Sequence, residues 1–523
     1  MTTELSASGH TSWWRRPGGG REAVTIATPL IVSSLSWTIM TFVDRMLLNH
    51  WSGAAMSAAF MASTAWFAVL CLPLGVCTYT GVFVAQYHGA DRPKRIGPAV
   101  WQGVWIALAA SPLMLAVIPF SSALFSFAGH GDEVTGLESS YFAILCWGAP
   151  ALLLSASLSC FYSGRGKTSI VMVVDTVFAM VNLLLDYWWI FGLEVNGQSV
   201  FPAMGIEGAG WATVASLWGK TFVYFAMICR ASNHARFATR QAQYDKPLFR
   251  RMFSFGWPSG VQLLLDVVGF TMFILLVGRL GQVENEATSL AFSISSLAFM
   301  PVCGLGMAAS ILVGQHLGEN KPEVAEQATW TTMHLAWGYM LLVSGSFVLL
   351  PEYYLAGFYS GEAVAESDSQ QRAAVAATAM VLMRYVAIYN FLDAMLIVFV
   401  SAVKGAGDTR FVLWVSLAMA TLLAVLSWLA VEVLGLGLYG CWALVSAWIA
   451  GLGVIFYLRF RNGSWKKMRV IEPFEEDAQE GPVTPASLSQ PPLDKALADE
   501  VALSAAACSA AETAGLGAAS PEA

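Results

Sequence analysis

The chain has 523 residues, of which 56% are hydrophobic and only 12% are charged, and its mean hydropathy is +0.59. This composition excludes an ordinary soluble protein, in which about 25% of the residues are charged. The formal net charge of −7 comes mainly from loops and the C-terminal end, so we expect no nucleic-acid partner. Repeated apolar stretches of about 20 residues predict membrane-spanning helices, since barrel strands would alternate over about 10 residues.

Twelve apolar segments are long enough to span a membrane. In chain order we expect helices at 24–49, 55–84, 97–119, 139–162, 169–192, 208–229, 252–278, 287–315, 328–350, 376–402, 411–433 and 438–459. The expected organisation is a cytoplasmic segment at 1–22, an N-terminal six-helix lobe at 23–231, a cytoplasmic linker at 232–250, a C-terminal six-helix lobe at 251–461 and a cytoplasmic tail at 462–523. We predict that the tail is disordered, because past Phe474 it is rich in Pro, Glu and Ser and low in aromatic residues.

Basic residues concentrate on one side of these helices. The runs at 92–95 and 250–251 lie on the side of the N-terminus, whereas the opposite loops and helix ends hold only Arg45, Arg279 and Arg372. The positive-inside rule therefore predicts that both termini are cytoplasmic. We expect a multi-pass protein of the cell membrane, in bacteria the inner membrane.

An internal repeat relates the two halves of the chain. The segment "LPLGVCTYTGVFVAQYHGADRPK" (72–94) aligns with "PVCGLGMAASILVGQHLGENKPE" (301–323), and the same offset pairs Pro29 with Pro258. After a change of loop length, "GRGKT" (164–168) aligns with "GAGDT" (405–409). Because six helices is an even number, the halves share one orientation. The repeat thus predicts an all-α fold of two six-helix repeats, related by a pseudo-twofold axis along the membrane normal, with a cleft between them.

Two short motifs carry no enzymatic chemistry. "GRGKT" lacks the first glycine of a nucleotide-binding loop, because Phe161 occupies that position, so we interpret it as a turn. The eight cysteines form no CxxC pair and no Cys/His cluster, and we expect no structural metal site. We predict neither enzyme activity nor a cofactor.

Polar residues inside the apolar segments of the first half form one set. Asp44 lies in the 24–49 helix, and the 169–192 helix carries Asp175, Asn182 and Asp186 on one stripe. Lys220 lies seven residues after Thr213 and on the same face of its helix, so it is either a counter-ion or a lysine that extends towards the membrane surface.

The second half carries a separate set, Asp266 in the 252–278 helix and Asp393 about halfway through the 376–402 helix. A carboxylate at that depth costs about 3 kcal/mol even on the lenient insertion scales. One such residue could serve packing alone, but several together indicate an ion or proton pathway along a polar cavity. Burial favours the protonated form of a carboxyl group, so such a group can alternate between proton-bound and free states.

Several motifs together carry a family resemblance over nearly all of residues 22–461. They are "FVD" at 42–44, "VAQYHGADRPKR" at 84–95, "VNLLLDYWWIFG" at 181–192, "GIEGAGWAT" at 205–213, "VGQHLGE" at 313–319 and "LDAMLIVFVSAVKGAGDT" at 392–409. In these motifs the sequence resembles the multidrug and toxic compound extrusion (MATE) transporters. The resemblance implies an N-lobe cation site of Asp44, Asn182, Asp186 and Thr213, and a C-lobe site of Asp266 and Asp393.

Two residues depart from the family pattern. The family more often has Glu at the position of Asp266, and Asp175 has no counterpart among the family's site residues. Both departures leave the coupling ion open between H⁺ and Na⁺. We consider Asp175 a candidate proton relay, the alternative being a solvated residue near the inner mouth.

The resemblance implies a secondary active multidrug efflux transporter, embedded in lipid and functional as a monomer. It would export lipophilic, often cationic, small-molecule drugs or toxins by antiport with H⁺ or Na⁺ through alternating access, without a cofactor. Na⁺, if used, would bind at the coupling residues. The alternative is a lipid-linked oligosaccharide flippase of the same superfamily, which would need a basic cleft.

Overall fold

The computed structural model describes residues 12–126, 131–195, 198–359 and 369–472. The described residues up to Ile471 form one compact unit. The disorder that we predict past Phe474 lies outside the described residues.

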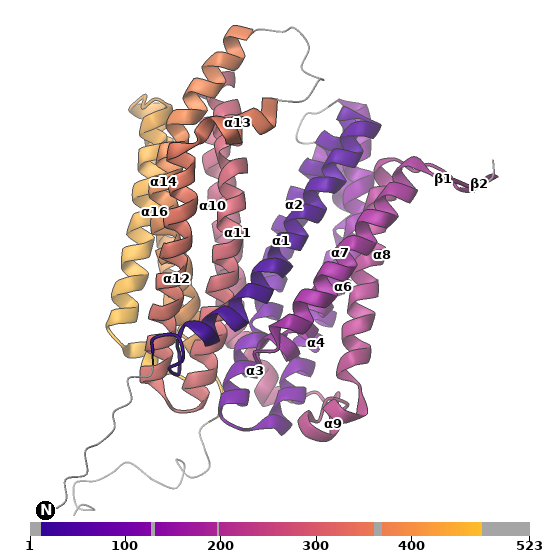
Figure 1. Cartoon of the computed structure of the whole chain (residues 1–523). Coiled ribbons are helices and arrows are strands. Elements are labelled where there is room, and N and C mark those ends of the chain that lie inside the picture. Colours follow the sequence, from indigo (N-terminus) through magenta and orange to yellow (C-terminus); the bar gives the residue numbers. More distant parts are fainter. Residues whose placement is uncertain (1–11, 127–130, 196–197, 360–368, 473–523) are drawn as a thin grey trace, which may run out of the picture. The chain divides into compact units, whose positions relative to one another are not determined.

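Long helices that run roughly parallel make up nearly all of this unit (Figure 1). The first half contains α1 (Gly20–Trp51), α2 (Gly53–Thr78), α3 (Thr80–Gly89), α4 (Pro93–Ala116), η1 (Ile118–Phe120), α5 (Ser121–Ser126), α6 (Asp132–Ser163), α7 (Thr168–Phe191), α8 (Ile206–Ile228) and α9 (Ala231–Phe237). The second half contains α10 (Lys246–Val277), α11 (Gln282–Gly318), α12 (Pro322–Leu349), α13 (Pro351–Tyr359), α14 (Ser369–Ala406), α15 (Thr409–Trp428), η2 (Leu429–Val433), α16 (Leu438–Arg461) and η3 (Ser464–Lys467).

The number of spans agrees with the sequence. Within the described part of the chain, eleven helices are long and apolar enough to cross a membrane, or twelve when α8 and α9, bent by 64°, count as one span. The 55–84 segment becomes a span of Gly53–Gly89 that includes both α2 and α3. The protein is therefore an all-α integral membrane protein of two six-helix repeats. Most of its helices begin a few residues before the predicted start and end within a few residues of the predicted end.

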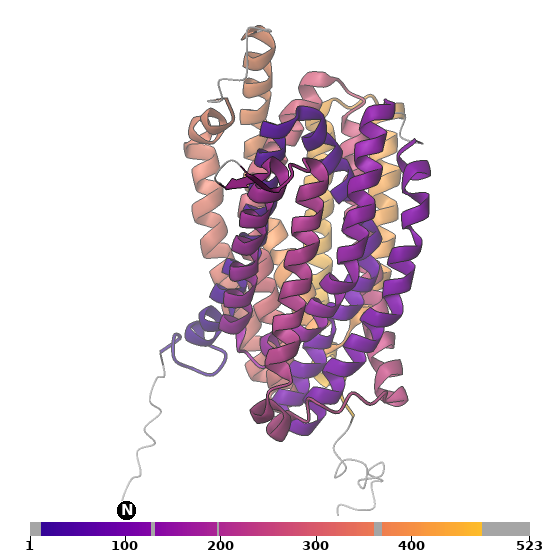
Figure 2. The same cartoon turned by 90° about the vertical axis from the view of Figure 1, so that its right-hand side faces the viewer.

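One small element departs from the all-helical expectation. An antiparallel pair, β1 (Leu193–Val195) and β2 (Gln198–Phe201), connects α7 to α8. It lies at the end of the bundle opposite α9 (Figures 1 and 2). We call these the hairpin end and the α9 end; the α9 end also holds the start of α1.

Buried apolar side chains form two clusters that follow the two halves of the sequence. The start of α1, from Ala23 to Leu30, packs into the cluster of the second half. Reciprocally, Leu248 and Met252 at the start of α10 pack into the cluster of the first half. The first helix of each repeat therefore begins against the other repeat, and each contains its repeat-related proline, Pro29 or Pro258.

The segment after α16 corrects the predicted start of the disordered tail. Residues 462–471, which we had assigned to that tail, include η3 and pack on the bundle. Trp465 and Val470 are completely buried, and Ile471 is nearly so. Burial of these apolar side chains stabilises the folded chain. The polar residues that follow in the sequence offer no such stabilisation.

Candidate cation and substrate site

Three side chains of the first half meet in the part of the bundle nearer the hairpin end. Asp44 comes from α1, and Asn182 and Asp186, one turn apart on α7, are completely buried. When its amide NH₂ faces the carboxyl groups, Asn182 donates to Asp186 Oδ2 at 3.1 Å and to Asp44 Oδ1 at 3.3 Å. Its oxygen then accepts from the backbone N–H of Thr213 on α8 at 3.3 Å. The structure thus brings together the four N-lobe residues that the resemblance implies.

The carboxyl groups of Asp44 and Asp186 both contact the Asn182 amide, and their charges interact. Asp186 Oδ1 is buried and has no hydrogen-bond partner among the described residues. Two facing carboxylates repel each other unless a proton or a cation lies between them. Carboxylate and amide oxygens are hard donors, so this group fits either H⁺ or Na⁺.

Sequence reasoning missed Tyr141 of α6, which interacts with this group, and the buried Glu138 on the same helix. Tyr141 is buried and interacts electrostatically with both Asp44 and Asp186. Glu138, one turn earlier, is also buried. We had predicted that this helix begins at residue 139, whereas α6 begins at Asp132. The acidic start of α6 is typical of a polar loop, so the sequence did not indicate that this helix includes Glu138.

A cavity of about 370 Å³ extends from this group towards the α9 end. Polar side chains of α1, α7 and α8 line one wall, including those of Asn182, Thr213, Asp175 and Lys220. The rest of the lining is mostly apolar, and it includes two methionines of α11. The cavity has the size that drug-like ligands need. Its Met and aromatic side chains give it an adaptable surface.

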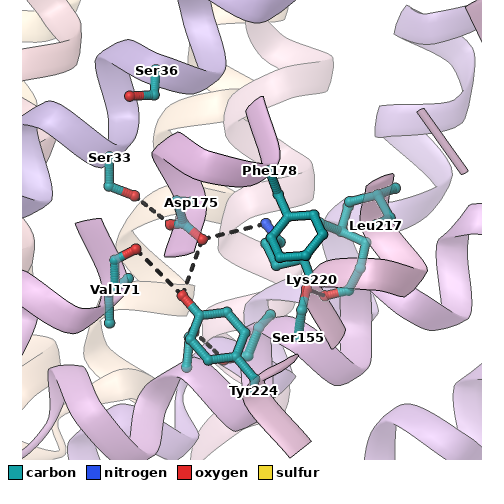
Figure 3. A network of polar contacts seen from close by, with 12 residues as sticks. Ser33, Ser36, Ser155, Val171, Asp175, Phe178, Leu217, Lys220 and Tyr224 are labelled. Carbon is teal, nitrogen blue, oxygen red and sulfur yellow. Dashed lines mark hydrogen bonds and ion pairs between the residues drawn. The ribbon is translucent and has the colours of Figure 1, made fainter. Parts of the chain in front are cut away.

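Asp175 lies at the α9-end side of this cavity, in a network of polar contacts (Figure 3). Ser33 Oγ of α1 donates a hydrogen bond to Asp175 Oδ2, and Tyr224 Oη donates to Oδ1 at 3.1 Å. Lys220 Nζ forms an ion pair with Oδ1 at 3.6 Å. Of the two roles open for Lys220, the structure supports the counter-ion. The Asp175 side chain is 22% exposed and lines the cavity, where it has these three partners.

The second half brings Asp266 and Asp393 close enough for their charges to interact. Gln262 Nε2 donates to Asp266 Oδ2 at 2.9 Å, and Lys404 Nζ donates to Gln262 Oε1 at 2.9 Å. Sequence reasoning missed Lys404, which we placed in a loop; α14 continues to Ala406. The spacing of eleven residues from Asp393, three helical turns, is the signal that would have found it.

Comparison with known proteins identifies the family of this chain. The sequence profile of the MatE family matches residues 29–188 and 258–429, one segment in each repeat. The chain therefore belongs to the MatE family, whose members are membrane transporters and not enzymes.

Two relatives and two solved structures extend this comparison. "Multidrug resistance protein PmpM" of Pseudomonas aeruginosa is 29% identical over 474 residues, covering 88% of this chain and 95% of the relative. "Probable multidrug resistance protein NorM" of Pasteurella multocida is 27% identical over 400 residues, covering 76% and 83%. An outward-facing multidrug resistance MATE family transporter is similar in fold, with a TM-score of 0.76 at 16% identity, covering 87% and 98%. The eukaryotic MATE transporter AtDTX14 gives 0.74 at 19% identity, covering 86% and 96%.

Proposed function

We propose that this protein is a secondary active multidrug efflux transporter that exports lipophilic, often cationic compounds by antiport with H⁺ or Na⁺. The observation that carries the proposal is the facing pair of Asp44 and Asp186 at one end of a drug-sized cavity. Binding of the cation between these carboxyl groups would remove their repulsion and alter the packing of α1 against α7. The names of the relatives, multidrug resistance proteins, support the same function.

The two polar sets would act as two coupling sites. Asp44, Asn182, Asp186 and Thr213 would hold the cation in the first half, and Asp266 with Asp393 would do so in the second. For a neutral drug exchanged for one inward cation, a membrane potential supplies about 2.3 kcal/mol per charge per 100 mV, which supports roughly a 50-fold drug gradient. Exchange of a monovalent cationic drug for one cation moves no net charge, so the concentration gradient of the cation would drive it. Coupling through these carboxylates would therefore need no nucleotide site.

Alternating access would require α1 to move relative to α7 and α8. Pro29 removes a backbone hydrogen bond within α1 and so permits bending there. Asp175 accepts a hydrogen bond from Ser33, four residues further along α1. We place the α9 end in the cytoplasm because its loops are basic, and Asp175 would then relay a proton on the inner side of the cavity.

A flippase is not favoured, because Lys220 is the single cationic side chain among the described residues that line the cavity, whereas a pyrophosphate group would require several. Lys220 faces Asp175, and Lys404 interacts with Asp266. The relatives are likewise named for multidrug resistance.

Dye transport in inside-out vesicles tests the proposal. Vesicles with the protein should accumulate ethidium when either a pH gradient or a Na⁺ gradient is imposed alone, and the effective gradient identifies the ion. Vesicles without the protein are the control. Absence of accumulation under both gradients, with the protein present in the membrane, would overturn antiport.

A further inference from the structure

The amine of Lys220 carries a charge that its surroundings satisfy only in part. Its Nζ lies 3.6 Å from Asp175 Oδ1, an ion pair longer than a hydrogen bond. Within the described residues, no hydrogen bond from this amine is present. An ammonium group has three N–H donors, and leaving them unmade in a low-dielectric site is costly.

Asp175, by contrast, does not depend on Lys220. Ser33 donates to one of its oxygens and Tyr224 to the other, so both carboxylate oxygens already accept a hydrogen bond (Figure 3). A pair built for stability alone would place the amine at hydrogen-bond distance, where charge-assisted bonds are strongest. The geometry therefore leaves the amine available to a further acceptor.

The lining of the cavity indicates what that acceptor is. Lys220 is the only cationic side chain among the described residues that line it, and its own side chain is only 14% exposed. Trp37, whose ring centroid lies 6.0 Å from Nζ, and Phe178 border the same space. A ligand with an anionic group and a flat ring system would use all three side chains. Its anionic group would bind Lys220 Nζ, and its rings would contact Trp37 and Phe178.

We propose that Lys220 forms an anion-binding subsite at the α9-end side of the cavity, which takes the carboxylate of an aromatic ligand. This inference rests on the proposed function, since it names a substrate class for the same cavity. Asp175 competes with the ligand for the amine and holds it in place when the cavity contains no anion. Substrates would then include aromatic carboxylates as well as cations.

A matched pair of dyes separates this subsite from general dye binding. Rhodamine 110 bears a free carboxylate, and rhodamine 123 is its methyl ester. Binding to the purified protein would be followed by fluorescence anisotropy. The readout is the ratio of the dissociation constants, carboxylate over ester, in the wild type, Lys220→Met, Lys220→Arg and Asp175→Asn.

We expect Lys220→Met to raise this ratio about tenfold or more, which is the effect of one charge-assisted hydrogen bond. Lys220→Arg, which keeps the charge, should restore most of the difference. Asp175→Asn removes the competitor and should lower the ratio below the wild-type value. Lys167→Met, at an exposed lysine outside the cavity, is the matched control and should leave the ratio unchanged.

The opposite results are equally defined. If Lys220→Met and Asp175→Asn shift the ratio in the same direction, the pair is structural and the subsite is wrong. Binding of rhodamine 123 without rhodamine 110 by the wild type would overturn the subsite and leave the proposed function standing. Binding of neither dye, together with no ethidium transport, would overturn both.

Discussion

Gln86 and Gln315, which the internal repeat pairs with each other, make the same hydrogen bond in opposite directions across the two halves. Gln86 Nε2 of α3 donates to the carbonyl of Gly405 at 3.1 Å, and Gln315 Nε2 of α11 donates to the carbonyl of Gly164 at 2.8 Å. The two acceptors are themselves repeat-related. These reciprocal bonds join the halves at the α9 end, so a transporter that opens there must break both.

Removal of either glutamine side chain should favour opening of the α9 end. Each lost bond is worth about 1 kcal/mol, and Gln86→Ala also leaves the backbone N–H of Val470 without its partner. Distances between spin labels at positions 167 and 321, measured by pulsed electron paramagnetic resonance, should lengthen in Gln86→Ala and Gln315→Ala.

Gln102→Ala is the matched control for this experiment. Gln102 is buried like Gln86, but its Nε2 donates to the carbonyls of Pro98 and Gln243. Pro98 lies in the first half and Gln243 in the linker that follows it, so neither bond joins the two halves. Gln102→Ala should lower stability without changing the label distances. Wild-type distances in both Gln86→Ala and Gln315→Ala would show that these bonds do not hold the α9 end closed.

Two repeat-related glycines allow the halves to approach this closely. A Cβ added at Gly89 would lie 1.9 Å from the Gln315 carbonyl oxygen, and one at Gly318 would lie 2.2 Å from that of Gln86. Gly318→Ala should therefore lower the free energy of unfolding by about 1–3 kcal/mol through overpacking. Thermal unfolding in detergent, followed by tryptophan fluorescence, measures the change.

Gly338 provides the control for that substitution, since a Cβ there would meet no atom within 4 Å. Gly338→Ala removes a glycine from the interior of α12 and should be neutral or stabilising by up to about 1 kcal/mol. Equal unfolding temperatures for the two alanine variants would contradict the close packing at Gly318.

The spans and the first polar set could be predicted from the sequence for a physical reason. Apolar length decides which segments span the membrane, and spacing along one helix decides which side chains share a stripe. Asn182 and Asp186 are neighbours by this rule, and in the structure the Asn182 amide contacts both Asp186 and Asp44.

Contacts between helices could not be predicted from the spacing of residues along the sequence. The links of Gln262 to Lys404, and of Ser33 to Asp175, depend on how α10 packs near α14 and α1 on α7. No spacing within one segment encodes these distances. The packed segment around Trp465 was missed because a short apolar run beyond the last span resembles a tail.

Asp393→Asn should abolish gradient-driven dye efflux while the protein still inserts in the membrane. Asp393 is 9% exposed inside α14 and interacts with Asp266, so loss of its charge removes a protonatable group from the second half. Glu432→Gln is the control, because Glu432 pairs with Arg279 at an exposed site, where an ion pair contributes little. Full gradient-driven efflux by a well-expressed Asp393→Asn would exclude a coupling role.

Asp175→Asn should slow proton-driven efflux of a cationic dye, because it removes the proposed relay beside Ser33 and Tyr224. The rate of ethidium efflux would be measured at several pH values on either side of neutrality. A rate that equals the wild-type rate at every pH would leave Asp175 with only its structural contacts.

In our proposal, the facing carboxyl groups of Asp44 and Asp186 couple cation entry to drug export. The most direct measurement compares wild type and Asp44→Asn in proteoliposomes, with ethidium accumulation under the effective cation gradient and ethidium exchange at equilibrium without one. From this coupling we expect Asp44→Asn to lose accumulation, falling to the level of protein-free liposomes, while equilibrium exchange continues. Accumulation by Asp44→Asn at the wild-type rate and extent would contradict it.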